Sequence, residues 1–324
     1  MKRFAPLMLA VSLFATLSAA ALDGAWTASL DEKRPERMYL SITRGRMHQN
    51  GSTMAVSSFS GLTSAQIRAA TMTPVNFEMR REAGVLAFEG TFRNGNGAGQ
   101  FTFTANRGYI DLVRALGIEF TLDRREKHDE EDSLFTLALH DVSTAFIKTM
   151  IAEGYRVKLE DYLTMRIFDI TPEYIREMRS LGFRDITHDE LVATRIHKVT
   201  PEYVREMRAA GWDLTLDELQ SSRIHGATPQ FAEEMRKLGY GSLDHGDLVS
   251  FRIHGVTGEL VANLRKLGYD KLTADELISM RIHRVTPEFI RELEQAGYAK
   301  VPVEKLISMR IHGIDAKFIR KMAE

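Results

Sequence analysis

The triplet Arg-Ile-His occurs five times in this 324-residue chain. It is the pattern whose residue types could most directly carry chemistry, because histidine binds metal ions and transfers protons near neutral pH. The triplets therefore raise two chemical hypotheses, a metal site and a catalytic base. The histidines concerned are His197, His225, His254, His283 and His312.

The spacing of the triplets argues against both hypotheses. Their arginines, with an earlier Arg166, follow one another at intervals of 29, 28, 29, 29 and 29 residues. Stacked helical copies lie roughly 9–10 Å apart, so the histidines form a ladder and not a cluster of three or four ligands. An enzyme needs one site rather than five equal ones. We therefore expect the triplet to be a repeated helix ending, where a basic residue suits the partial negative charge, and we predict no metal and no catalytic residue.

One repeat spans residues 199–225 and reads as two helices. Thr200 is a good N-cap, Pro201 suits the first helical position, and Gly211 ends the first helix. Thr215 to Glu218 has the spacing of a capping box that opens the second helix. The apolar pattern places Leu219, Ile224, Ile278 and Ile282 on the buried side of the second helices. A single hairpin cannot bury its own apolar stripe, so neighbouring copies must stack.

The N-terminal part of the chain has a different periodicity. Met38, Leu40 and Ile42 alternate with polar neighbours, as in a half-buried strand, and so do Val75, Phe77 and Met79. Asn94-Gly95 and Asn96-Gly97 are hairpin signals. The predicted fold class is α+β multidomain. A small antiparallel β domain (22–105) is followed by an α-solenoid of 28–29-residue helical hairpins (106–324), about seven and a half in number.

The first 21 residues are typical of a secretory signal peptide. Lys2 and Arg3 precede an apolar run, and Ala19 to Ala21 offer small residues for cleavage. We expect the mature chain to begin near Leu22, without a membrane span, in the periplasm or outside the cell; an uncleaved anchor is the alternative. The chain has no cysteine and a formal net charge of −1, which disfavours disulfides and nucleic-acid binding.

Other sequence signals of catalysis are absent. The chain has no HExxH, GxSxG, P-loop or cysteine nucleophile, so we predict neither an enzyme nor a cofactor. An acidic insert, with His128 and the segment Asp129 to Asp132, could bind a divalent cation. A solvated loop is favoured, because EF-hand spacing is missing, but both interpretations stay open.

The repeated segments "TPEYIREMRSLGF" and "TPEYVREMRAAGW", together with "FRNGNGAGQFTF", resemble the C-terminal repeats and β module of some BlaR/MecR-type antirepressor metallopeptidases. The resemblance covers residues 24 to 324. In those proteins the activity belongs to a membrane-embedded zinc domain with HExxH, which this chain lacks, so no catalytic residue carries over. The resemblance implies a secreted repeat protein without the peptidase domain.

The function that the sequence favours is a non-catalytic extracytoplasmic scaffold for a protein or peptide partner. We place its partner surface on the loop edge that carries Trp212, Tyr240, Arg208 and Arg236, because aromatic and arginine side chains are favoured at interfaces. Packing of these rings over the helix ends is the alternative. The rival functions are a sensor or accessory of a peptidase-linked envelope system, and an enzyme with a site in the β domain.

Overall fold

The fold is described here from a computed structural model, in which residues 22–44, 48–122 and 130–323 are placed. The chain divides into two compact units, the first ending at Ile167 and the second beginning at Phe168. The first unit holds the sheet and the helices α1 to α5, and the second holds α6 to α16. The predicted order, an antiparallel β domain followed by tandem helical hairpins, is confirmed.

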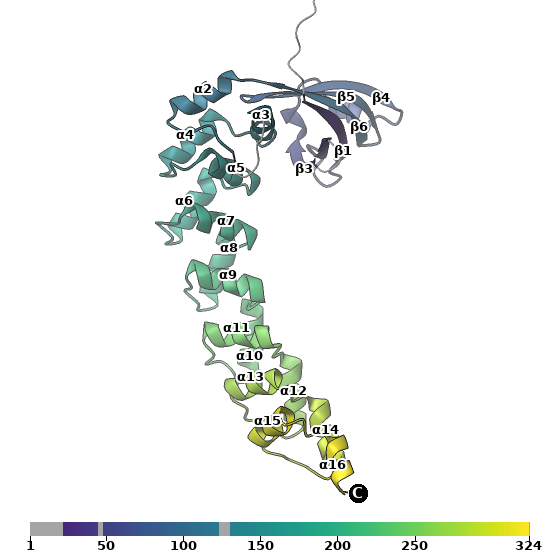
Figure 1. The fold of residues 1–324 in the computed structure, drawn as a ribbon, viewed down its shortest axis with the longest axis vertical. Coiled ribbons are helices and arrows are strands. Elements are labelled where there is room, and N and C mark those ends of the chain that lie inside the picture. The colour runs from purple at the N-terminus through teal and green to yellow at the C-terminus, as the bar shows by residue number, and fades with distance from the viewer. Residues whose placement is uncertain (1–21, 45–47, 123–129, 324) are drawn as a thin grey trace, which may run out of the picture. The chain divides into compact units, whose positions relative to one another are not determined.

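Six antiparallel strands form one curled sheet in the order β3-β2-β1-β6-β5-β4 (Figure 1). The strands are β1 (Leu22–Leu30), β2 (Arg37–Arg44), β3 (His48–Ala55), β4 (Thr73–Arg81), β5 (Gly84–Arg93) and β6 (Asn96–Ala105). A short 3₁₀ turn, η1 (Val56–Ser58), and the helix α1 (Ser64–Arg68) lie between β3 and β4. Thr63 is the N-cap of α1 and forms a capping box with Gln66.

The core of the sheet follows the predicted alternation. Met38, Leu40 and Ile42 are buried, and so are Val75, Phe77 and Met79. Trp26 lies edge-on to Phe77, with ring centroids 5.3 Å apart. Its indole Nε1 donates to the carbonyl oxygen of Glu89 at 3.1 Å. Aromatic side chains of β1, β4 and β5 therefore close one face of the sheet.

A pair of glycines lets β5 and β6 approach each other closely beside the Trp26 ring. Gly90 of β5 pairs with Gly99 of β6. A Cβ atom on Gly90 would lie 2.2 Å from the carbonyl oxygen of Ala98 and 2.8 Å from the Trp26 ring. Any larger residue at this position would push the two strands and the indole apart.

The turn between β5 and β6 uses only the first of the two Asn-Gly pairs. Asn94 and Gly95 both have positive φ, 48° and 81°, as a type I′ turn requires. The prediction that Asn96-Gly97 is also a turn is wrong, because both residues belong to β6 and Gly97 pairs with Phe92. The two-residue turn Asn94-Gly95 brings Arg93 opposite Asn96 and so fixes the pairing of β5 with β6. Asn96-Gly97 therefore continues the strand.

The helices pair along the chain as α2/α3 to α14/α15, with α16 left over. This makes seven pairs and one helix in the described part, as predicted. The first helices are α2 (Gly108–Ala115), α4 (Thr144–Ala152), α6 (Pro172–Ser180), α8 (Pro201–Ala209), α10 (Pro229–Lys237), α12 (Gly258–Lys266), α14 (Pro287–Gln295) and α16 (Ala316–Ala323). The second helices are α3 (Glu130–Leu139), α5 (Leu159–Ile167), α7 (His188–Ile196), α9 (Leu216–His225), α11 (His245–His254), α13 (Ala274–Ile282) and α15 (Val303–Ile311).

The predicted helix boundaries are confirmed by their caps. The Thr200 side chain accepts from the backbone N–H of Tyr203 at 3.2 Å, directly before Pro201. Gly211, with φ of 93°, follows the end of α8. Thr215 opens α9 with a complete capping box. Threonine, proline and glycine therefore set the bounds of α8. Buried residues of successive copies, such as Phe251, Leu277 and Leu306, belong to one core.

Candidate functional site

In the second unit, the second helices lie against one another and form a layer of their own. The helix α9 contacts α7 and α11, and α13 contacts α11 and α15. Figure 1 shows the helices of this unit following one another in tandem. Because the repeat length is nearly constant, equivalent positions of these helices form rows that cross the array.

The arginine of each triplet is used inside the fold. Nε of Arg281 donates to the carbonyl oxygen of His254 at 3.0 Å, and Nε of Arg223 donates to that of Lys198 at 2.9 Å. Each acceptor lies at the end of the second helix of the preceding repeat, where carbonyl groups lack a helical partner. Arg223 and Arg281 therefore each cap the second helix of the preceding repeat, where their charge is also favourable.

An aromatic ring of the first helix holds most of these guanidinium groups. Arg223 lies 3.8 Å from the centroid of the Tyr203 ring, and Arg252 lies 5.0 Å from that of Phe231. In the next repeat, Leu260 occupies the position of the ring, so the arginine of that repeat has only its carbonyl contact. The ring and the carbonyl together fix the direction of the side chain.

The isoleucine of the triplet points to solvent, which corrects the prediction that Ile224 and Ile282 are buried. Ile224 is 57% exposed and Ile282 is 54% exposed. The buried stripe of α13 is Leu277 and Met280. At about 100° per residue, Ile282 lies about 200° around the helix from Met280 and faces outward. We call the row of exposed isoleucines in the second unit the isoleucine face; it consists of Ile196, Ile224, Ile253, Ile282 and Ile311.

Three further rows accompany the isoleucine face at i−7, i−4 and i−3, the positions that share one side of a helix. The i−3 row is small: Ala193, Ser221, Ser250, Ser279 and Ser308. The i−4 row is half-buried and mostly aliphatic: Val192, Gln220, Val249, Ile278 and Ile307. The i−7 row is exposed and acidic except in α11: Asp189, Asp217, Gly246, Asp275 and Glu304. The face thus combines apolar side chains, hydroxyl groups and carboxylates.

Several polar groups of this face are unused by the fold. Asp189 contacts His188 at 2.9 Å. Among the residues that the structure describes, Asp217, Asp275 and Glu304 have no ion-pair partner. These groups remain available to a bound molecule.

The histidines of the triplets lie at the helix ends, as predicted. His225 and His254 are the last residues of α9 and α11, and a left-handed glycine follows each of them. His197, His283 and His312 are the C-cap residues of α7, α13 and α15. Within the described ranges, no group of three or more histidine and carboxylate side chains is arranged to hold a metal ion.

The predicted partner edge contains side chains that are engaged within the fold. Trp212 is half-buried and lies edge-on to the His245 ring at 6.0 Å. The Tyr240 hydroxyl donates to the carbonyl oxygen of Leu272 at 2.9 Å. These rings pack against the core of the second unit, and binding of a partner by this edge stays a prediction.

The two arginines of that edge differ from each other. Nη2 of Arg208 donates to the carbonyl oxygen of Leu181 at 2.7 Å, and so caps the first helix of the preceding repeat. Arg236 instead bonds Glu233 of its own helix at 2.6 Å. An open hollow of about 660 Å³ lies beside Arg208, lined also by Asp213.

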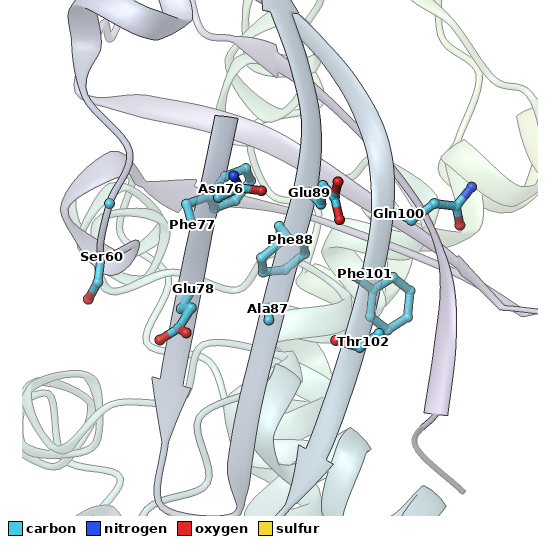
Figure 2. Close-up of a pocket in the computed structure, with 11 residues that line it drawn as sticks. Ser60, Asn76, Phe77, Glu78, Ala87, Phe88, Glu89, Gln100, Phe101 and Thr102 are labelled. Carbon is cyan, nitrogen blue, oxygen red and sulfur yellow. The ribbon is translucent and has the colours of Figure 1, made fainter. Parts of the chain in front are cut away.

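A second hollow, of about 480 Å³, lies on the sheet across β4, β5 and β6. Figure 2 shows Asn76, Glu89 and Gln100 side by side on these three strands, as their register requires. Glu78 flanks the small Ala87 and forms an ion pair with Arg80. The hollow offers carboxylates and amides, and no histidine, cysteine, lysine or arginine lines it. It could accept hydrogen bonds from a ligand, and an enzymatic role in this unit stays a prediction.

The acidic insert is described only from Glu130 onward, and residues 123–129, with His128 and Asp129, lie outside the described residues. Glu130 to Asp132 form the first turn of α3. An Asp132 carboxylate oxygen lies 2.5 Å from Arg44, and one of Glu130 lies 3.7 Å from Arg107. Two of the acidic side chains are thus paired with arginine.

No family model, curated protein or solved structure matches the chain. Among the described helices, none alone has the length and apolar character to cross a membrane, although α3 and α4, bent by 71°, pass that criterion as a pair. The isoleucine face is the feature that the sequence analysis missed. The buried pair Leu277 and Met280, set on a helical wheel, would have placed Ile282 opposite the core.

Proposed function

We propose that this protein is an extracytoplasmic scaffold that binds a polypeptide partner on the isoleucine face. The observation that carries the proposal is the repetition of a half-exposed isoleucine at one position of every second helix in the second unit. An isoleucine in water contributes little to folding, whereas burial against a partner contributes roughly 25 cal/mol per Å² of apolar surface. An aligned apolar row with polar borders is typical of an interaction site.

The outer side of the first helices is a weaker candidate, because its charges are paired within the array. Arg205 bonds Glu177 of the preceding repeat at 2.5 Å, and Arg291 bonds Glu288 of its own helix at 3.2 Å. The charges of such exposed pairs are already satisfied by one another and by water. A partner that contacts them would therefore gain little binding free energy.

Export of the chain is part of the proposal. Lys2, Arg3 and the apolar run that follows support it, and we expect cleavage near Leu22. N-terminal sequencing of the protein recovered from the periplasm or medium tests this part. We expect a mature chain that starts near Leu22; a chain that keeps Met1 would contradict it.

Site-specific photo-crosslinking tests the binding surface. A photoreactive phenylalanine at Ile253 should label a polypeptide in an envelope extract, and one at the exposed Glu206 of α8 should not. The label at Ile253 should disappear when Ile224→Ser and Ile282→Ser are combined with it, provided that the variant keeps its helical content. Equal labelling from Glu206 and Ile253 would exclude the isoleucine face.

The loop edge of Trp212, Tyr240, Arg208 and Arg236 is the second candidate surface. The hollow beside Arg208 favours it. The same photoreactive residue at the exposed Asp213 tests this edge. Labelling from Asp213 without labelling from Ile253 would move the partner to the loops.

A further inference from the structure

We infer that the isoleucine face binds an extended, proline-rich segment in the polyproline II conformation, with a basic side chain at every third residue. The inference rests on the proposed function and names the chemistry of the partner. It combines two observations, the hydroxyl row and the unpaired carboxylates, with the general spacing of packed helices.

The spacing of the second helices selects the conformation of the ligand. Packed helices lie about 9 Å apart. Polyproline II rises about 3.1 Å per residue with three residues per turn, so side chains on one edge recur about every 9.3 Å. A β-strand repeats its side chains about every 6.7 Å, and an α-helix has a pitch of about 5.4 Å. Of these three, polyproline II presents one equivalent side chain to each successive repeat.

The small row provides a floor for such a ligand. Ala193, Ser221, Ser250 and Ser279 let a backbone approach the helices closely. The hydroxyl groups of Ser221, Ser250 and Ser279 have no hydrogen-bond partner among the described residues. A polyproline II segment has no internal hydrogen bonds, so its carbonyl oxygens are free to accept from these serines.

The acidic row selects the charge of the ligand. The carboxylates of Asp217, Asp275 and Glu304 border the face on one side and are unpaired in the described part of the chain. A threefold helix that rests one edge on the isoleucines turns a second edge toward these carboxylates. Lysine or arginine on that edge complements them, and Gly246 marks a repeat without this contact.

A peptide series tests the inference with the full-length protein. The probe is a fluorescent 15-residue peptide of five Val-Pro-Lys triplets, and binding is measured by fluorescence anisotropy. We expect a Kd at least about tenfold lower than that of a peptide of the same composition whose lysines are not spaced by three. A Val-Pro-Glu peptide should bind at least as weakly as the shuffled one, because its charges oppose the acidic row.

Protein variants assign the contacts. The pair Asp217→Asn and Asp275→Asn should raise the Kd for the Val-Pro-Lys peptide about tenfold and reduce its salt dependence. Ile224→Ser with Ile282→Ser should raise it as well. Tyr298→Ser is the matched control, because Tyr298 is also half exposed but lies outside the face; it should leave the Kd unchanged.

The inference is overturned if the shuffled peptide binds as tightly as the periodic one, if no peptide of the series binds, or if the asparagine variant keeps the wild-type Kd. The crosslinking experiment judges the proposed function separately. Labelling from Ile253 together with a failed peptide series would keep the isoleucine face as a binding surface and reject this ligand chemistry.

Discussion

Replacement of Arg223 by methionine should loosen the end of the preceding second helix, α7. The guanidinium donates to the carbonyl oxygen of Lys198 and lies 3.8 Å from the Tyr203 ring centroid. A hydrogen bond from a charged donor contributes roughly 1.5–3 kcal/mol, and an exposed cation–π contact about 0.5–1 kcal/mol. Because Arg223 is exposed, the low end applies, and we expect a loss of about 2 kcal/mol. Methionine keeps the apolar stem, so the loss reports the head group.

In two other repeats the arginine makes only one of these two contacts. Arg281 donates to the carbonyl oxygen of His254 but has Leu260 in place of an aromatic ring, so Arg281→Met should cost about 1.5 kcal/mol of local stability. Arg310 lies over Phe289 at 5.0 Å, while its Nε is buried without a partner among the described residues. Arg310→Met should therefore cost only about 0.5 kcal/mol. The expected order of the three losses is Arg223, Arg281, Arg310.

Amide hydrogen exchange measures these losses locally, since a repeat array need not unfold in one step. The free energy of opening should fall in α7 for Arg223→Met and in α11 for Arg281→Met. Arg291→Met is the control, because Arg291 bonds Glu288 of its own helix. If Arg223→Met opens α7 no more than the control variant does, the arginine does not couple the repeats and apolar packing alone joins them.

Ile253→Ser should change the free energy of unfolding by less than about 1 kcal/mol, because Ile253 is 53% exposed. Truncation of the buried Leu248 to alanine should instead cost about 2–5 kcal/mol. Equal losses of the two variants in urea unfolding would contradict the outward placement of Ile253. The double variant Trp212→Ser with Tyr240→Ser should lose at least about 2 kcal/mol of unfolding free energy, since both rings pack on the core. An unchanged urea midpoint would show that the rings contribute little to the fold and are free to bind a partner. Burial lowers the pKa of His245, so the folded chain binds fewer protons than the unfolded chain, in which histidine titrates near 6.5. The contribution of His245 is thus complete above about pH 6.5 and falls as the pH drops toward the folded pKa. Between pH 7 and 5.5, His245→Gln should lose less stability than the wild type, and equal losses would refute this assignment.

The sequence was sufficient for the features that depend on local chemistry. Thr200, Pro201 and Gly211 act within one turn of their own helix, so their types and spacing predict where α8 begins and ends. The alternation of Met38 and Leu40 predicts a strand for the same reason. These interactions join residues that are close in the chain, so a short stretch of sequence contains both partners.

The candidate site depended on contacts that the sequence does not display. The acceptor of Arg281 lies 27 residues earlier, at His254, and periodicity alone does not say which earlier group the arginine reaches. Hydrophobicity alone predicts burial of Ile282, but Leu277 and Met280 occupy the inner side of α13 and Ile282 faces outward. The exposed isoleucine recurs in each second helix of the second unit although it contributes little to packing, and this recurrence is what supports the proposed binding surface.

The hydrogen bonds between arginine side chains and helix ends also bear on the order in which the repeats are completed during synthesis. Each runs from a later repeat to an earlier one, as from Arg281 to the carbonyl oxygen of His254 and from Arg208 to that of Leu181. A repeat that leaves the ribosome can form both helices from its own residues, but its helix ends are completed only when the next repeat emerges. During synthesis from the N-terminus, the helix ends of each repeat are therefore capped only after the following repeat has been made. Each of these hydrogen bonds can form before most of the later repeats exist, so few other donors compete for the same carbonyl oxygen.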